Sequence, residues 1–245
     1  MCTVSWIREP GGYHLFCNRD ERKSRGLGSG PRLQARGWVR FVAPVDTNFG
    51  GTWIAVNEFA VAACLLNGAN LTGRLSQKRH NGRRSRGLLI PELIWAQSAD
   101  ECIFRLKQLD LTCFAPFTVV FLQAQTPAIV AEWDGANTTI VPSGDSLMPL
   151  TSSSYDAEGA QKARRDEFER HAIAFGQVDP AVLYAFHNSH RDSPDAYSPC
   201  MHRADAETVS FSWVAVTEDE IRFIYLAGPP CTTSKSEQQV LRRAA

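Results

Sequence analysis

Short apolar runs, separated by turn residues, occupy both ends of the chain. Residues 3–7 and 13–18 are β-prone and flank a Pro-Gly-Gly turn, which predicts a hairpin at the very N-terminus. Residues 208–216 and 221–226 flank an acidic turn, and the first of these runs alternates between apolar and smaller polar positions. This pattern predicts a second hairpin near the C-terminal end.

The middle of the chain contains further strand signals. Residues 60–66 are apolar at both parities, which predicts a strand that is buried on both faces and ends at Asn67. An asparagine at a strand end is either a turn former or a hydrogen-bond donor aimed at a ligand. The remaining predicted strands cover residues 38–42, 52–56, 117–123, 128–133 and 138–141.

Helical patterns fall between these β regions. Residues 85–97 have apolar positions at helical spacing, and a Ser-x-x-Glu capping box at Ser98 begins a second helix. Two more helices are predicted at residues 156–175, before a glycine stop, and at 180–186, after an Asp-Pro start. We expect surface loops at residues 21–37 and 142–155, and a flexible tail at about residues 232–245.

Hairpins at both ends, helices grouped between β blocks and the absence of βαβ alternation indicate an α+β protein with antiparallel sheets. A length of 245 residues fits one large domain, and we expect residues 1–245 to form a single domain. Two sheets packed face to face with helices outside would accommodate every element. Periodicity alone does not select this arrangement over a two-layer fold.

Composition narrows the possible partners. Hydrophobic residues make up 44% of the chain, and 26 basic residues balance 26 acidic ones, which argues against general binding to nucleic acid. The sequence has no secretory signal pattern and no apolar run long enough to span a membrane. Its seven cysteines are scattered and include no Cys-x-x-Cys pair, which favours free thiols in the cytoplasm.

Two polar segments suggest binding chemistry. The segment 74–86 is strongly basic, but it has no aromatic residue for base stacking, so a solvated loop is favoured over a phosphate site. Farther along, His187 and His190 are three residues apart and could share a metal with Cys200 or His202. No acidic partner accompanies them in a zinc-protease spacing, so we favour a loop and expect neither a metal nor a cofactor.

Cys2 is the strongest candidate for chemistry. If Met1 is removed, Cys2 carries both a thiol and a free α-amine. The amine, with a pKa of roughly 7.7 to 8.0, can act as the general base for a thiol with a pKa of about 8.5. The alternative is an ordinary buried cysteine in an edge strand.

Several separated motifs together resemble the NRDE protein family, which is related to transport and Golgi organisation protein 2. They occur in the family's order and span nearly the whole chain. The motifs are Met1-Cys2-Thr3, Asn18-Arg19-Asp20-Glu21, residues 50–57, residues 65–68, residues 200–203 and residues 228–231.

That family is similar to the N-terminal nucleophile hydrolases that include bile salt hydrolases and penicillin V acylases. The resemblance implies a four-layer αββα sandwich of two antiparallel sheets and cleavage of non-peptide amide bonds. It implies Cys2 as the nucleophile, Arg19 and Asp20 beside its thiol and amine, and Asn67 as the oxyanion donor, with Asn57-Glu58 at the matching spacing. Arg203 corresponds to a late active-site arginine. Ser152 stands where those hydrolases carry an asparagine, and we expect Asn18 and Ser152 to contact the substrate.

Three functions follow from the resemblance. The first is an amidohydrolase that acts on a small acyl compound through an acyl-thioester on Cys2. The second is a non-catalytic carrier or chaperone for haem, lipid or acyl-CoA, in which His14 and the histidines between 187 and 202 could take part. The third and weakest is an interaction protein of the secretory pathway. The sequence does not address the oligomeric state.

Overall fold

The computed structural model describes residues 2–68, 83–190 and 195–244. Within these residues the strands form two sheets, and every ladder between neighbouring strands is antiparallel. The predicted antiparallel α+β class is therefore confirmed. The basic residues at 74–82 lie outside the described part of the chain.

The first sheet has six strands in the order β10-β1-β2-β11-β12-β13. Both predicted terminal hairpins belong to it and lie side by side, because β2 pairs with β11. The strands are β1 (Cys2–Glu9), β2 (Gly12–Arg22), β10 (Leu150–Ser152), β11 (Ala206–Val216), β12 (Glu220–Leu226) and β13 (Ser236–Arg242).

The second sheet has seven strands in sequential order from β3 to β9. It is a meander, so each strand pairs with its neighbour in sequence, and only one connection, between β6 and β7, contains helices. The strands are β3 (Ser29–Arg36), β4 (Val39–Val45), β5 (Ile54–Asn57), β6 (Ala62–Asn67), β7 (Phe117–Leu122), β8 (Ile129–Trp133) and β9 (Thr138–Val141).

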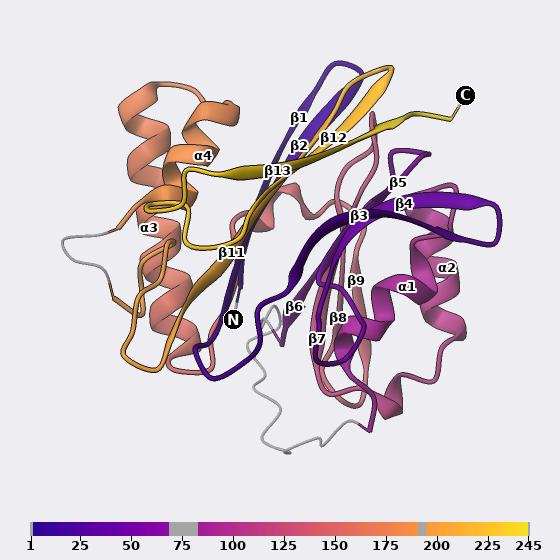
Figure 1. The fold of residues 1–245 in the computed structure, drawn as a ribbon, viewed down its shortest axis with the longest axis horizontal. Coiled ribbons are helices and arrows are strands. Elements are labelled where there is room, and N and C mark those ends of the chain that lie inside the picture. Colours follow the sequence, from indigo (N-terminus) through magenta and orange to yellow (C-terminus); the bar gives the residue numbers. More distant parts are fainter. Residues whose placement is uncertain (1, 69–82, 191–194, 245) are drawn as a thin grey trace.

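Helices cover the outer face of each sheet (Figure 1). The helices α1 (Leu89–Leu93) and α2 (Ala99–Gln108) pack on the second sheet, while α3 (Ala157–Phe175) and α4 (Pro180–Asn188) pack on the first. The apolar core between the two sheets contains residues from β1 and β2 on one side and from β5 and β6 on the other. The four-layer αββα arrangement implied by the resemblance is confirmed.

Three segments expected to be loop or tail form strands instead. β3 and β13 are edge strands, and β10 is a three-residue edge strand beside β1. An edge strand with mostly exposed or polar side chains lacks the apolar alternation that identifies a strand in sequence. The flexible tail predicted at 232–245 is therefore wrong for Ser236–Arg242, which pairs along the whole of β12.

The predicted helix at 85–97 is much shorter in the structure. A 3₁₀ turn at Arg86–Leu88 leads into α1, which ends at Leu93. The other helix starts follow their caps: Ser98 accepts a hydrogen bond from the Glu101 amide, and Asp179 accepts one from the Val182 amide. In the described residues, no helix has the length and apolar character needed to cross a membrane.

Candidate active site

Cys2 is the first residue of β1 and is flanked by two other strands. Its register partners are Arg19 on β2 and Ser152 on β10. The hairpin thus brings the Asn-Arg-Asp segment beside the thiol, as antiparallel pairing requires. The contribution of β10 could not be expected from sequence, because residues 142–155 show no strand pattern.

Ser152 contacts the main-chain nitrogen of Cys2. This nitrogen donates a hydrogen bond to Ser152 Oγ over 3.1 Å. In the full sequence the nitrogen belongs to the Met1–Cys2 amide, which cannot act as a base. Removal of Met1 would turn it into an amine that already has a hydroxyl partner.

The thiol of Cys2 is held in its neutral form. A hydrogen bond with the Cys17 thiol and burial raise the pKa of Cys2 well above its ordinary value. Cys17 also hydrogen-bonds to Cys64 on β6, so three thiols bridge the space between the sheets. Thiolate formation at Cys2 therefore needs a nearby base or cation.

Asp20 lies beside this thiol in a buried polar network. Its Oδ2 pairs with Arg164 Nη2 over 3.1 Å, and its Oδ1 accepts a hydrogen bond from the Thr208 hydroxyl over 2.7 Å. Arg164, on α3, is completely buried and also donates to the Thr3 hydroxyl. The network joins β1, β2, β11 and α3 directly behind Cys2.

Arg19 points toward the second sheet. Its guanidinium lies 4.1 Å from the ring centre of Trp53 and 3.4 Å from Asp46 Oδ2, which Arg25 also contacts at 2.5 Å. The Nη1 of Arg19 is buried and has no hydrogen-bond partner among the described residues. This side chain therefore places a buried cationic donor without a protein acceptor beside Trp53.

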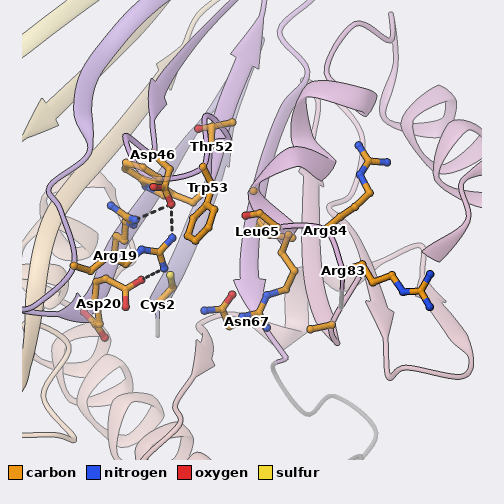
Figure 2. A pocket seen from close by; sticks show the side chains of 17 residues that line it. Cys2, Arg19, Asp20, Asp46, Thr52, Trp53, Leu65, Asn67, Arg83 and Arg84 are labelled. Carbon is orange, nitrogen blue, oxygen red and sulfur yellow. Dashed lines mark hydrogen bonds and ion pairs between the residues drawn. The ribbon is translucent and has the colours of Figure 1, made fainter. Parts of the chain in front are cut away.

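Two adjoining cavities of about 410 and 480 Å³ contain most of the candidate residues. Cys2 and Arg19 line the first, Ser152 and Arg203 line the second, and Asp20, Glu21, Asn67 and Arg86 line both. Figure 2 shows Cys2, Arg19 and Asp20 on one side and Asn67, at the exposed end of β6, on the other. The two sheets thus contribute opposite walls.

The approach of the 3₁₀ turn to the segment before β5 depends on Gly51. A Cβ on Gly51 would lie only 2.4 Å from the carbonyl carbon of Gly87, so no other residue fits without displacement of the backbone. The Thr52 amide donates to the Gly87 carbonyl over 2.9 Å. This contact brings Arg86 into both cavities, where it donates to the Pro116 carbonyl.

Asn18 does not line either cavity. It is fully buried, and its Nδ2 donates to the carbonyls of His187 and Pro199, each over 2.8 Å. Its position fits support of the last turn of α4 and of the segment before β11 better than contact with a substrate. Arg203 does reach the second cavity, where it pairs with Asp205 and covers the ring of Tyr155.

Sequence reasoning did not identify Arg164, Asp46 or Thr208. Arg164 lies within a run of charged residues on a helix, where nothing distinguishes a buried guanidinium from a solvated one. Thr208 is directly opposite Asp20 in the β2–β11 register, so only knowledge of that pairing could have found it.

A family model described as "Transport and Golgi organisation 2" matches residues 1–195. The chain belongs to this family. The match contains Cys2, the Asn-Arg-Asp-Glu segment and Asn67, and the NRDE resemblance is thereby confirmed. No curated protein matches the sequence of this Transport and Golgi organisation 2 family member significantly.

Solved structures with the same fold are N-terminal nucleophile hydrolases. An N-acylethanolamine-hydrolyzing acid amidase orthologue from Caenorhabditis elegans has a TM-score of 0.59 at 11% identity, covering 87% of this chain and 92% of its own. A mutant conjugated bile acid hydrolase from Clostridium perfringens also has a TM-score of 0.59, at 10% identity, and the match covers 100% of this chain and 97% of the hydrolase. Penicillin V acylase from Agrobacterium tumefaciens has a TM-score of 0.52 at 12% identity, and the match covers 93% of this chain and 83% of the acylase. At these identities the likeness concerns the fold alone.

Proposed function

We propose that this protein is an N-terminal cysteine amidohydrolase that cleaves the C–N bond of a small acyl amide. The observation that carries the proposal is the position of Cys2, which lines a cavity of about 410 Å³ together with Asn67 from the opposite sheet. A nucleophile on one wall and an amide donor on the other leave space for a carbonyl group between them.

In this mechanism Met1 is removed, and the freed amine of Cys2 accepts the thiol proton. The thiolate attacks the substrate carbonyl, and the C–N bond breaks as the leaving amine takes up that proton. Water, activated by the same amine, then hydrolyses the thioester and releases the acid and the thiol. Ser152 Oγ, which lies 3.1 Å from the nitrogen, would orient the amine during both proton transfers.

The side-chain amide of Asn67 would stabilise the oxyanion of the tetrahedral intermediate. One such donor typically contributes roughly 3 kcal/mol to the transition state, or about a 100-fold rate effect. Its place at the exposed end of β6 permits this role, because the side chain borders both cavities.

The charges around the cavity favour an acyl compound with an anionic group. The first cavity is lined by five arginines but only three carboxylates. Asp46 and Glu21 are occupied by Arg19 and Arg25, so Arg86, which lines both cavities, is the cation best placed for a substrate anion. The seven free cysteines support a cytoplasmic site of action.

One observation favours the second candidate, a carrier of haem, lipid or acyl-CoA on the same fold. The hydrogen bond with Cys17 and burial raise the pKa of the Cys2 thiol, which suits a structural thiol better than a nucleophile. The carrier function needs neither removal of Met1 nor a reactive thiol, so the two proposals differ in measurable ways.

The first test is intact mass spectrometry of the purified chain, followed by labelling with iodoacetamide and with penicillin V. We expect a mass without Met1 and one penicillin V adduct, which disappears in Cys2→Ala but persists in the control Cys113→Ser, whose residue lines neither cavity. Because iodoacetamide also reaches the partly exposed Cys113 and Cys231, its adduct on Cys2 is located by peptide mapping. Retained Met1, or equal labelling of wild type and Cys2→Ala, would contradict catalysis and favour the carrier.

The second test separates stabilisation of the oxyanion from the reactivity of the Cys2 thiol. We expect Asn67→Ala to slow acyl transfer by about 100-fold while iodoacetamide alkylation of Cys2 changes less than about threefold, because alkylation has no oxyanion intermediate. A parallel loss of both reactions would mean that Asn67 supports the position of Cys2 rather than an oxyanion.

A further inference from the structure

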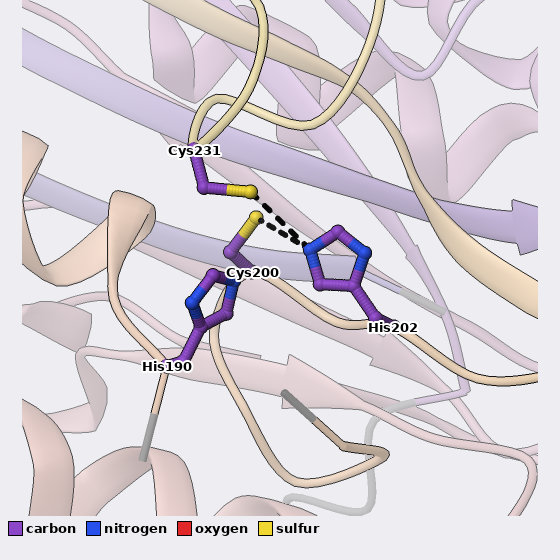
Figure 3. A group of neighbouring side chains, drawn as sticks. All are labelled: His190, Cys200, His202 and Cys231. Carbon is purple, nitrogen blue, oxygen red and sulfur yellow. Dashed lines mark hydrogen bonds between the residues drawn. The ribbon is translucent and has the colours of Figure 1, made fainter. Parts of the chain in front are cut away.

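Four potential metal ligands converge beside the end of α4, outside the two cavities. His190 follows α4, Cys200 and His202 precede β11, and Cys231 lies in the turn after β12. Their ligand atoms all lie within 4.8 Å of one another, and Figure 3 shows both sulfurs directed at the ring of His202. The sequence pattern at 187–202 favours a loop without a metal site, and nothing in it points to Cys231.

The distances match those across a tetrahedral zinc ion. His202 Nε2 lies 3.6 Å from Cys200 Sγ and 3.3 Å from Cys231 Sγ. Zn–S bonds of about 2.3 Å and Zn–N bonds of about 2.0–2.1 Å at the tetrahedral angle separate sulfur and nitrogen by about 3.6 Å. The other ligand atoms lie within 4.8 Å of one another and would move closer together as the ion binds.

Hydrogen bonding satisfies this cluster only in part, although Cys200 and Cys231 hydrogen-bond to each other. The Nε2 of His202 carries either one proton or one lone pair, so it can form only one good hydrogen bond with the two sulfurs that contact it. The Nε2 of His190 is buried without a hydrogen-bond partner in the described part of the chain. A central cation would use both sulfurs and both imidazoles at once.

We propose that His190, Cys200, His202 and Cys231 form a structural zinc site. Two thiolates and two imidazoles suit Zn²⁺ in a closed tetrahedral geometry, without an open position for a substrate. Binding converts the two thiols to thiolates and releases their two protons, so the bound ion is neutralised locally.

The ion would fasten the segment after α4, the segment before β11 and the turn after β12 to one another. The segment between Cys200 and His202 is continuous with the active site, because the Met201 amide donates to the Thr208 hydroxyl and that hydroxyl donates to Asp20. Cys200 is completely buried, whereas Cys231 is partly exposed. The zinc ion can therefore reach the cluster from the side of Cys231. Zinc would thus hold the loop that supports Asp20.

The test is elemental analysis of the untagged chain, purified with a thiol reductant. We expect about one zinc per chain in wild type and in the matched control Cys113→Ser, and less than about one tenth of that in Cys231→Ser. Cys231→Ser is chosen because a partly exposed turn tolerates the change better than buried Cys200. Equal zinc in Cys231→Ser and wild type would overturn the proposal.

A second measurement does not depend on the folding of a variant. After the zinc is removed with a chelator, wild type is titrated with Co²⁺, and we expect the thiolate-to-cobalt charge-transfer and intense visible bands of a tetrahedral thiolate site. Chelation should lower the Tm of wild type by at least about 5 °C and leave that of Cys231→Ser unchanged. Absent cobalt bands in a chain without bound zinc, or a Cys200–Cys231 disulfide in the reduced preparation, would overturn it.

Discussion

The surroundings of His187 in the fold decide its protonation state. In the sequence it is one of several polar residues in a His-Asn-Ser-His segment. In the structure it is fully buried on α4, stacked on Phe16 at 5.8 Å, with its Nε2 2.8 Å from Ser5 Oγ. Burial, with a smaller contribution from Arg164, lowers the pKa of His187 to about 3, so the ring is neutral in the folded protein.

This shift predicts an acid-sensitive stability. The unfolded chain, in which His187 has a pKa of about 6.5, binds more protons than the native state between pH 3 and pH 6.5. The contribution of neutral His187 to the free energy of unfolding is therefore complete above about pH 6.5, and it is lost as the pH falls toward 3. From pH 7 to pH 4 we expect a loss of roughly 3 kcal/mol in the free energy of unfolding, measured by urea denaturation.

The control for this prediction is His187→Gln, which removes the titrating ring. The variant should be less stable than wild type at pH 7, but its stability should fall less between pH 7 and pH 4. An equal fall in both proteins would assign the acid sensitivity to other groups.

At the scale of elements, the strands without a sequence signal are three of the four edge strands, β3, β10 and β13. β13 has a single buried apolar side chain, Leu241, among exposed polar neighbours, so its pattern is typical of a solvated tail. Pairing with β12 nevertheless orders it. Beyond the strand, Arg243 donates to the Gly11 and Thr217 carbonyls, and the Ala244 amide donates to Glu58.

Substitution of neighbouring residues on β13 tests whether this strand contributes to stability. Leu241 is 4% exposed and Val240 is 50% exposed, because successive side chains of a strand face opposite sides. We expect Leu241→Ala to lower the free energy of unfolding by about 2–3 kcal/mol and Val240→Ala by less than about 1 kcal/mol. Equal, small effects in thermal or urea denaturation would support a flexible tail instead.

At the scale of the whole molecule, one buried ion pair joins the outer helical layer to the sheet that carries the site. Arg164 on α3 and Asp20 on β2 are both inaccessible to solvent, and the threonines at positions 3 and 208 complete their hydrogen bonds. Such a pair need not stabilise the fold more than apolar residues would. It does fix the position of the carboxylate next to Cys2.

Removal of one partner of the Arg164–Asp20 pair should therefore destabilise the fold. We expect Arg164→Met to lower the free energy of unfolding by about 3–5 kcal/mol, because it leaves Asp20 charged and buried. The double variant Arg164→Met/Asp20→Asn should recover part of that loss. Lys162→Met, which removes an exposed pair on the same helix, should cost less than about 1 kcal/mol. A double variant less stable than Arg164→Met alone would contradict this account.

The sequence by itself determined the parts of the site that depend on local pairing. A hairpin at the N-terminus necessarily returns Arg19 and Asp20 to Cys2, and an apolar run that ends at Asn67 predicts a strand with that residue at its tip. The starts of the capped helices and most of the central strands could also be predicted, because each signal lies within a few neighbouring residues.

Only the tertiary structure decided which distant residues meet. Ser152 contacts the nitrogen of Cys2 across 150 positions, and Arg164 reaches Thr3 across 161. The four proposed zinc ligands come together because β12 returns Cys231 to the segment before β11. Such contacts depend on sheet order and on how the layers pack, which are set by the sum of many weak interactions and leave no local pattern in the chain.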